Sequence, residues 1–383
     1  MSDMKTFNFS SPTTVAFGNG TAEKLGFYLE KMGAKKALII ADKMMVEIGL
    51  VKRLIGLAGI ECLVYDDVKA EPPVENTLEA LKKYQDNGCD VIIGVGGGSP
   101  LDVAKAAALL ASNGGSYNDY VGIGKVGKRC APLILIPTTA GTGSESSIFS
   151  IMLVNGVKAG VVDYNITAHI AIVDPLLTVS VPRKLTASTG LDAFCHNMET
   201  FISANANPMA DTLSLRSIGL IAKWLPKAVG DPNDIEARYW VMFASMLGGY
   251  SSNTCEGCAA NHGFAFALGG MFHVPHGLAN AVFLQHVLPV VGVAEYEKVR
   301  RMGEAMGENM AGLSDREAFE KTMEAIRNLV KNVGCDIPVS EFGVKESDLP
   351  KLAEETVKQA RVMGHSTYKL TVEEIQEIFK RAM

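Results

Sequence analysis

Four residues in the second half of the chain have side chains that bind metal ions and a spacing that can bring them together. Asp192 and His196 are four residues apart in TGLDAFCHNMET, so one helix presents a carboxylate and an imidazole on the same face. His262 and His276 follow in NHGFAFALGGMFHVPHG. One carboxylate and three neutral imidazoles suit a first-row divalent ion, Fe²⁺ or Zn²⁺, better than Mg²⁺ or Ca²⁺. An Asp–His pair at this spacing can also be a helix-terminal ion pair, so the prediction rests on all four residues.

The two C-terminal histidines can share one ion only if the chain turns between them. In a continuous helix, their separation of 14 residues would place them roughly 21 Å apart. We therefore expect breaks at Gly269-Gly270 and Pro275, with one histidine on each of two successive helices. His273, three residues before His276, is then expected close to the metal.

A glycine-rich loop in the first half has the composition of an anion-binding turn. The run Gly96-Gly97-Gly98-Ser99-Pro100 follows the apolar segment VIIGV and precedes an alanine-rich helical pattern. Ser99 is expected as the N-cap and Pro100 as the first helical residue, so that free N–H groups face an anion such as a pyrophosphate. The alternative is a tight strand-to-helix turn without a ligand.

The order of the motifs differs from the usual dinucleotide fingerprint, GxGxxG followed by an acid. The acid that can bond the adenosine ribose is Asp42, at the end of ALIIAD, and it precedes the glycine loop. We therefore expect a nucleotide fold other than the standard Rossmann unit. A second loop, PTTAGTGSE at 137–145, concentrates hydroxyl groups after the strand pattern LILIP, where ligands bind in open α/β sheets, although a surface turn is the alternative.

The cysteines favour a reduced environment. Seven of them, an odd number in a long chain, fit reduced thiols better than a disulfide framework, in agreement with the cytoplasmic location expected for a chain without a secretory signal pattern. Cys255 and Cys258 form a CxxC pair that can be a redox or metal site. Without a second CxxC or a thioredoxin-like context, packed thiols are favoured.

Two kinds of element must position these residues. Up to about residue 180, short apolar runs at 35–42, 61–68, 90–99 and 132–139 alternate with amphipathic stretches, which predicts βαβ units and a parallel sheet. A terminal hairpin near residues 13–20 is expected to add edge strands. From VPRKLTASTGLD onward the apolar period is about 3.6, which predicts helices only. We expect an α/β dinucleotide-binding domain at 1–182, a helical metal and substrate domain at 183–383, and a ligand cleft between them.

The overall composition agrees with two globular domains. The chain has 383 residues, 48% hydrophobic and 20% charged, with a formal net charge of −6. There is no run of about 18 uncharged apolar residues and no secretory signal pattern, so no membrane span is predicted. The mildly acidic balance, without basic runs, argues against nucleic-acid or anionic-membrane partners.

Five segments occur in order that together resemble one family. GGGSPLDVAK, TTAGTGSE, DPLLT, TGLDAFCH and HGLANA make the chain similar to the iron-containing (group III) alcohol dehydrogenases, from FGNG near the N-terminus to LTVEEI at the end. The resemblance implies a Rossmann-like parallel-sheet domain, an all-helical C-terminal domain of dehydroquinate synthase-like architecture, and a homodimer or larger homo-oligomer. It also implies a nicotinamide dinucleotide and Fe²⁺, with Zn²⁺ possible, as cofactors.

The resemblance assigns roles to individual positions. The residues that would hold the pyrophosphate and ribose are Gly97, Gly98, Ser99 and Asp102. The residues that would line the middle of the dinucleotide are Thr138, Thr139, Thr142 and Ser144. Lys158 and Leu177 would lie nearer the nicotinamide. Asp42 matches the ribose-reading acid, and a carboxylate there repels a 2′-phosphate, which favours NAD(H) over NADP(H). The metal ligands would be Asp192, His196, His262 and His276.

One departure from the family affects the predicted substrate pocket. Relatives carry a second histidine four residues after the first C-terminal ligand, and this chain has Phe266 there. A proton relay or substrate hydrogen bond at that position is lost. His273 can substitute in part and is our candidate catalytic residue.

The resulting prediction is an NAD-dependent, metal-dependent oxidoreductase that interconverts a small alcohol or diol and its aldehyde. Lyases or cyclases of the dehydroquinate synthase type and glycerol-phosphate dehydrogenases share the architecture. They act on phosphorylated substrates, whereas residues 186–210 and 255–285 contain no Arg or Lys. A further alternative, motivated by Phe266, is a nucleotide- and metal-binding protein with little turnover.

Overall fold

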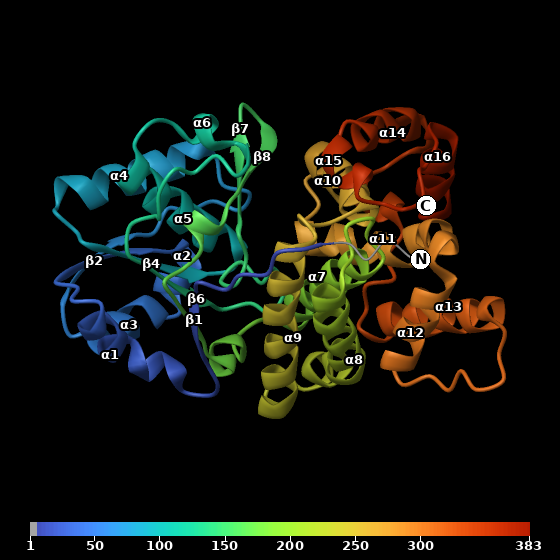
Figure 1. Cartoon of the computed structure of the whole chain (residues 1–383), viewed down its shortest axis with the longest axis horizontal. Coiled ribbons are helices and arrows are strands. Elements are labelled where there is room, and N and C mark those ends of the chain that lie inside the picture. Colours follow the sequence, from blue (N-terminus) through green and yellow to red (C-terminus); the bar gives the residue numbers. More distant parts are fainter. Residues whose placement is uncertain (1–5) are drawn as a thin grey trace. The chain divides into compact units, whose positions relative to one another are not determined.

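The computed structural model describes residues 6–383, and these form two compact units, each considered by itself (Figure 1). The division along the chain falls after Ser180, where the sequence predicted it after residue 182. Residues 6–9 group with the helical unit that begins at Val181, and Ser10–Ser180 make up the α/β unit.

The α/β unit is built on a six-stranded sheet in which every pair of neighbouring strands is parallel. The order is β1-β9-β6-β4-β2-β3. The strands are β1 (Thr14–Phe17), β2 (Lys36–Ile40), β3 (Glu61–Tyr65), β4 (Val91–Gly96), β6 (Leu133–Pro137) and β9 (Ile170–Val173). The helices are η1 (Thr21–Lys24), α1 (Leu25–Lys31), α2 (Lys43–Glu47), α3 (Leu50–Ala58), α4 (Val74–Asp86), α5 (Gly98–Asn113), α6 (Tyr117–Tyr120), η2 (Tyr164–Ile166) and η3 (Pro175–Thr178).

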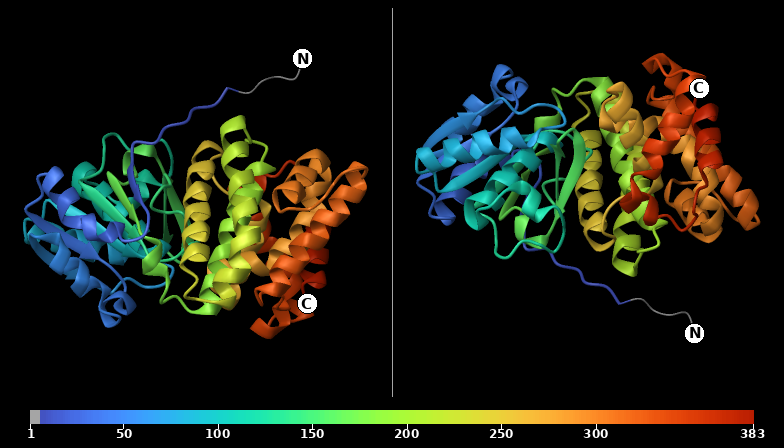
Figure 2. Two further views of the ribbon diagram at one scale, coloured as in Figure 1. Left: turned by 90° about the horizontal axis from the view of Figure 1, so that it is seen from below. Right: turned by 90° about the horizontal axis from the view of Figure 1, so that it is seen from above.

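Both faces of this sheet are covered, as a buried parallel sheet requires. Leu38 and Ile40 of β2 belong to an apolar cluster with α4 and α5, whereas Ala37 and Ile39 belong to a cluster with α1 and α3. All six residues of β4 are buried. Figure 2 shows the helices on either side of the strands. The predicted parallel α/β domain is therefore confirmed.

The expected N-terminal hairpin is wrong. β1 pairs in parallel with β9 and forms one edge of the sheet. The hairpin lies instead in a second, three-stranded sheet of β5 (Gly122–Ile123), β8 (Val157–Val162) and β7 (Phe149–Val154), where β7 and β8 are antiparallel. Its turn is Asn155-Gly156, both at positive φ, as the two-residue hairpin turn requires.

The helical unit contains the second half of the chain, and its expected helical character is confirmed. Helices α7, α8 and α9 pack against one another, as do α10 and α11. The elements are α7 (Arg183–Phe201), α8 (Pro208–Gly230), α9 (Ile235–Thr254), α10 (Ala260–Phe272), α11 (His276–Val291), η4 (Gly292–Glu295), α12 (Tyr296–Ala305), α13 (Asp315–Asn332), η5 (Val339–Phe342), η6 (Glu346–Asp348), α14 (Leu349–Val357), α15 (Ala360–Gly364) and α16 (Val372–Arg381).

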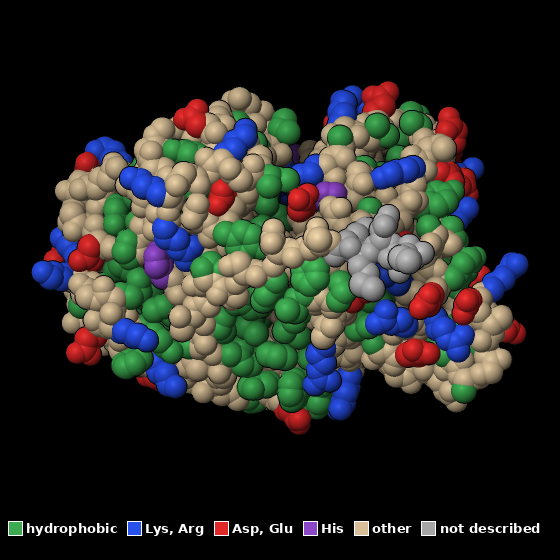
Figure 3. All heavy atoms as spheres, in the orientation of Figure 1, with side chains coloured by type: hydrophobic (Ala, Val, Ile, Leu, Met, Phe, Trp, Pro, Cys, Tyr) green, Lys and Arg blue, Asp and Glu red, His purple; other side chains and the backbone are tan. Residues whose placement is uncertain are grey.

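One stretch of this unit has the length and hydropathy of a membrane-crossing helix. It is His276–Ala305, and more than half of its most apolar window is buried inside the protein. The stretch is divided into α11, η4 and α12. Burial against α7, α10 and α13 is the pattern of a core helix. On the surface that Figure 3 shows, acidic and basic side chains are interspersed.

Candidate metal centre and nucleotide-binding loops

Helix α7 carries the first two predicted metal ligands on one buried face. Asp192 is only 1% exposed, and His196 lies one helical turn later. The start of α11 approaches this helix closely at Gly277, where an added Cβ would lie 3.0 Å from the carbonyl oxygen of Ser188. A glycine at this position thus lets His276 reach Asp192.

The turn between the two C-terminal histidines lies later than expected. Gly269 and Gly270 are inside α10, which continues to Phe272, so the predicted glycine break is wrong. The helix ends at His273, whose φ of 55° is left-handed, and α11 begins after Pro275. The ring of His262 near the start of α10 lies 5.2 Å from that of His276, measured between centroids.

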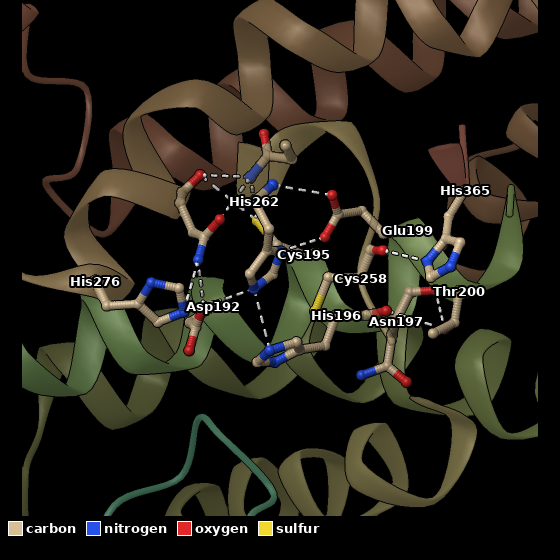
Figure 4. Close-up of polar contacts among 12 residues, drawn as sticks. Asp192, Cys195, His196, Asn197, Glu199, Thr200, Cys258, His262, His276 and His365 are labelled. Atoms are coloured by element: carbon tan, nitrogen blue, oxygen red, sulfur yellow. Dashed lines mark hydrogen bonds and ion pairs between the residues drawn. The ribbon is translucent and has the colours of Figure 1, made fainter. Parts of the chain in front are cut away.

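The four predicted ligands and Cys258 form two trios that share His262 (Figure 4). In one, the ligand atoms of Asp192, His262 and His276 all lie within 4.8 Å of one another. Asp192 Oδ1 is 3.7 Å from His262 Nε2 and 3.8 Å from His276 Nε2. His196 belongs to the other trio, and its Nε2 is 3.1 Å from Nε2 of His262.

This arrangement fits a first-row divalent ion. Two donors bound tetrahedrally at about 2.1 Å lie about 3.4 Å apart, and the observed separations bracket that value. Imidazole and carboxylate donors are those that Fe²⁺ and Zn²⁺ accept. Residues Asp192, His196, His262 and His276 can therefore hold such an ion.

Two further residues orient these donors, and neither was predicted from the sequence. Glu199 accepts hydrogen bonds from Nδ1 and, at 3.1 Å, from the backbone N–H of His262, so the Nε2 lone pair faces Asp192 and His196. Asn280 donates from Nδ2 to Asp192 Oδ1 at 2.8 Å. Burial opposes the charged imidazole of His262, but nearby Cys258 and Glu199 outweigh it and raise the His262 pKa well above its usual value.

Replacing Glu199 by glutamine is expected to weaken metal binding about 10–100-fold, because the ring of His262 loses its charged partner. Isothermal titration of the metal-free protein with Zn²⁺ measures this affinity. Glu236→Gln, an exposed glutamate near the start of α9, is the control and should bind zinc as the wild type does. An unchanged zinc affinity in Glu199→Gln would show that Glu199 does not support the metal centre.

Phe266 and His273 differ in their relation to the centre. Phe266 stacks on His276 with ring centroids 5.5 Å apart and meets His262 edge-on at 6.0 Å. It therefore places an apolar ring directly beside two ligands. His273 is exposed at the C-terminal end of α10 and belongs to neither trio, so its expected catalytic role stays a prediction.

In the α/β unit, three predicted loops follow neighbouring strands at the same edge of the sheet. Asp42 follows β2, Gly97 follows β4 and Thr138 follows β6. Because β3 lies on one side of β2 and β4 on the other, the strand order reverses between β2 and β4. Ligands of doubly wound sheets bind at this point of reversal, and the order resembles the flavodoxin type, which explains why the acid precedes the glycines.

Close contacts define the shape of the glycine loop. Gly96 has a φ of +140°, and a Cβ there would lie 2.8 Å from Pro100 Cγ and 3.4 Å from Asp42 Oδ2. A Cβ on Gly98 would lie 2.9 Å from Thr142 Cγ2, and one on Gly97 would lie 3.5 Å from Thr139 Oγ1. The structure thus brings Asp42, the glycines and the threonine loop together, and glycine is required where they meet.

The beginning of α5 differs from the prediction. Gly97 is the N-cap, and the helix starts at Gly98, so Ser99 and Pro100 lie within the first turn. Backbone N–H groups at this end still lack partners inside the helix, as at any helix start. No side chain caps α5, whereas Asp42 caps the neighbouring helix α2. Its Oδ1 accepts from the N–H of Met45 at 3.1 Å, and burial raises the pKa of its carboxyl.

Asp102 and Ser144 bond to each other beneath the loops. Ser144 Oγ donates to Asp102 Oδ1 at 2.6 Å, and Asp102 Oδ2 accepts from the N–H of Ile151 at 3.0 Å. Lys105, which no sequence pattern singled out, is fully buried and donates to Ser144 Oγ at 2.8 Å. Burial lowers the pKa of Lys105 and raises that of nearby Glu145 to about 7. This network holds the threonine loop onto α5.

Of the remaining cofactor candidates, Lys158 and Leu177 lie outside this group of contacts, whereas Thr138 belongs to it. Lys158 on β8 forms an ion pair with Glu71, with Nζ 2.6 Å from Oε1. Leu177 on η3 is buried in the cluster that contains Ile39 and Ile93. Thr138 is 3% exposed, and its backbone N–H donates to Gly96 O at 2.9 Å.

A doubly wound α/β unit with glycine and threonine loops at its strand reversal is followed by a helical unit whose histidines and carboxylate can hold a metal ion. This combination is typical of two-part metal-dependent enzymes. The family model "Iron-containing alcohol dehydrogenase" matches residues 12–175. The model "Fe-containing alcohol dehydrogenase family, C-terminal" matches residues 186–383. The chain belongs to the iron-containing alcohol dehydrogenases, and it is an oxidoreductase that interconverts alcohols and aldehydes.

Individual relatives match nearly the full length of the chain. The NAD-dependent methanol dehydrogenase of Bacillus methanolicus is 35% identical over 98% of this chain and 100% of its own. The long-chain-alcohol dehydrogenase 1 of Geobacillus thermodenitrificans is 38% identical over 95% of this chain and 94% of its own. A solved 1,3-propanediol oxidoreductase superposes with a TM-score of 0.95 at 35% identity, covering 99% of this chain and 100% of that one.

Proposed function

We propose that the enzyme is NAD(H)-dependent and iron-dependent and interconverts a small alcohol or diol with its aldehyde. The observation that carries this proposal is the convergence of Asp192, His262 and His276 on one point, with His196 adjoining through His262. When bound, the ion supplies Lewis acidity toward the alcohol or carbonyl oxygen, and the nicotinamide supplies the hydride acceptor or donor.

The side chains of the centre prepare it for this chemistry. Glu199 accepts from Nδ1 of His262, so Nε2 is the nitrogen that faces the other donors and would bind the ion. Asn280 holds the carboxylate of Asp192 toward His276. Phe266 stacks on the ring of His276 and meets that of His262 edge-on, and an apolar ring beside the two ligands favours an apolar substrate chain over a charged one.

The residues of the metal helices also favour an uncharged substrate over a phosphorylated one. No Arg or Lys occurs at 186–210 or 255–285. A phosphate would need such partners in a buried pocket. This supports a small alcohol or diol rather than the sugar phosphates of related architectures.

The function is tested by NADH oxidation with a panel of aldehydes, using protein reconstituted with Fe²⁺ under anaerobic conditions. Short aliphatic aldehydes and 3-hydroxypropanal should be reduced, and glyceraldehyde 3-phosphate should not. The chelator-stripped protein should be inactive until iron is restored. Absence of turnover with every aldehyde would contradict the proposal and favour a binding protein with little activity.

The choice of NAD(H) over NADP(H) is proposed to rest on Asp42. Its Oδ2 lies beside the glycine loop, where a 2′-phosphate would meet a negative charge. Asp42→Gly should raise the use of NADPH relative to NADH by at least about tenfold. Removing the repulsion between the carboxylate and the 2′-phosphate is expected to favour NADPH binding by about 1.4 kcal/mol or more, which corresponds to that factor. The ratio of kcat/KM for NADPH and NADH measures the change. The control is Glu47→Gly, which replaces an exposed acid at the end of α2 and should leave the ratio unchanged. An unchanged ratio in Asp42→Gly would show that Asp42 does not contact the ribose.

We further propose a cytoplasmic homodimer or larger homo-oligomer. All seven cysteines lie within residues 6–383 and none of them forms a disulfide there, which supports a reducing compartment. Light scattering of the purified protein measures the oligomer size.

A further inference from the structure

We propose that Cys258 is a metal ligand in this chain: with His196 and His262 it forms a thiolate-containing set that binds a thiophilic divalent ion such as Zn²⁺. This set lies beside the trio of Asp192, His262 and His276, with which it shares His262. The inference rests in part on the proposed metal centre, because the four-residue centre and this set share the imidazoles of His196 and His262.

The positions of the three side chains carry the proposal. The ligand atoms of His196, Cys258 and His262 all lie within 4.8 Å of one another. The two imidazole Nε2 atoms are 3.1 Å apart, so both nitrogens face one small volume. Figure 4 shows the sulfur of Cys258 beside these two rings. A cysteine and two histidines converging in this way match the donors of zinc sites.

The backbone around Cys258 is held in place from two sides. Glu256 and Gly257 have φ values of 60° and 106°, which turn the chain sharply between α9 and α10. His365 Nδ1 lies 2.9 Å from the carbonyl oxygen of Cys258, and Arg361 donates to that of Glu256 at 2.9 Å. The thiol is therefore placed by a fixed turn rather than by a free loop.

The other cysteine of the CxxC pair has a different environment. Cys255 is buried, and its Sγ lies 3.7 Å from the carbonyl oxygen of Thr200 and 3.5 Å from that of Asn205. It belongs to neither metal trio, and neither cysteine of the pair forms a disulfide. Cys255 therefore provides a matched control for Cys258.

The two sets select ions by donor chemistry. A thiolate with two imidazoles suits Zn²⁺ or Co²⁺, because the thiolate is a soft donor. A carboxylate with imidazoles is a set of harder donors. Nδ1 of His262 faces Glu199, so its single remaining nitrogen can bind one ion at a time. On binding, the thiol of Cys258 loses its proton to solvent. Zinc is therefore expected to use Cys258 and to compete with iron for His196 and His262.

The test is a titration of the metal-free full-length protein with Co²⁺, which reports thiolate ligation by a near-ultraviolet sulfur-to-metal charge-transfer band. The band should appear in the wild type and in Cys255→Ser, and it should be absent in Cys258→Ser. Zinc affinity, measured by competition with a chromophoric chelator, should fall at least about tenfold in Cys258→Ser. No band at saturating Co²⁺, or a band that persists in Cys258→Ser, would overturn the assignment.

Alkylation of the wild-type protein gives a second test that needs no variant. Zinc should slow the reaction of Cys258 with iodoacetamide, read by mass spectrometry, while Cys62, a half-exposed thiol of the α/β unit, should react equally with and without zinc. Equal alkylation of Cys258 in both conditions would also overturn the proposal. If these tests fail while iron-loaded protein reduces aldehydes, only the Cys258 assignment is wrong; absent turnover with a clear band contradicts only the proposed function.

Discussion

Replacing His262 by alanine will remove both metal binding and activity. This ring lies at the centre of the donors: its Nε2 is 3.1 Å from that of His196 and 3.7 Å from Asp192 Oδ1. Lewis-acid stabilisation is worth several kcal/mol, and about 4 kcal/mol corresponds to a thousandfold in rate. We expect kcat/KM for aldehyde reduction to fall at least about a thousandfold and iron content to fall to background.

The matched control removes a histidine from a neighbouring helix. His286 lies on α11, the helix that begins with His276, but belongs to neither metal trio. His286→Ala should retain iron and most of the activity. Elemental analysis and the NADH assay, applied to both variants, distinguish the two outcomes. Iron retained at wild-type level in His262→Ala would show that the ligand assignment is wrong.

Replacing Gly96 by alanine will weaken NADH binding while leaving the metal centre intact. A residue other than glycine at a φ of +140° adds backbone strain of about 1–3 kcal/mol, and its Cβ would lie 2.8 Å from Pro100 Cγ. Pro100 is in the first turn of α5, so relief of the clash must move that helix start or the loop. We expect the Kd for NADH, measured by fluorescence titration, to rise at least about tenfold.

The control for this variant carries similar strain without the clash. Gly114, at the other end of α5, has a φ of +71°, and a Cβ added there would meet nothing within 4 Å. Gly114→Ala should lower thermal stability but leave the Kd for NADH near the wild-type value. If Gly96→Ala also binds NADH normally, the glycine loop does not form the nucleotide site.

Periodicity and residue chemistry predicted the architecture because they act over short distances along the chain. Apolar runs separated by amphipathic stretches identified the buried parallel strands, and the spacing of Asp192 and His196 placed both on one helix. Glu199 could have been found by the same reasoning, since it lies three residues after His196. Asn280 is likewise four residues after His276.

Local signals were less informative where tertiary contacts decide the backbone. Gly269 and Gly270 were expected to end a helix, but helices tolerate glycine at a modest cost, and the turn occurs at His273–Pro275. Ser99 was expected as an N-cap, yet the cap is Gly97, whose extended backbone follows β4 directly. The hairpin was missed although Asn155-Gly156 is a strong signal for one.

Contacts between distant parts of the chain could not be predicted from spacing. Cys258 reaches His196 across 62 residues because the turn at Glu256-Gly257 is held by Arg361 and His365. The bond between Asp102 and Ser144 joins the start of α5 to the threonine loop, and no local pattern marks it. Such pairs depend on how separate elements pack.

The most direct test of the metal centre is a crystal structure of iron-loaded protein with diffraction data collected at the iron absorption edge. We predict one anomalous peak about 2.0–2.2 Å from donor atoms of Asp192, His196, His262 and His276. An anomalous peak at other residues, or none at this centre in protein that contains stoichiometric iron, would contradict the proposed centre.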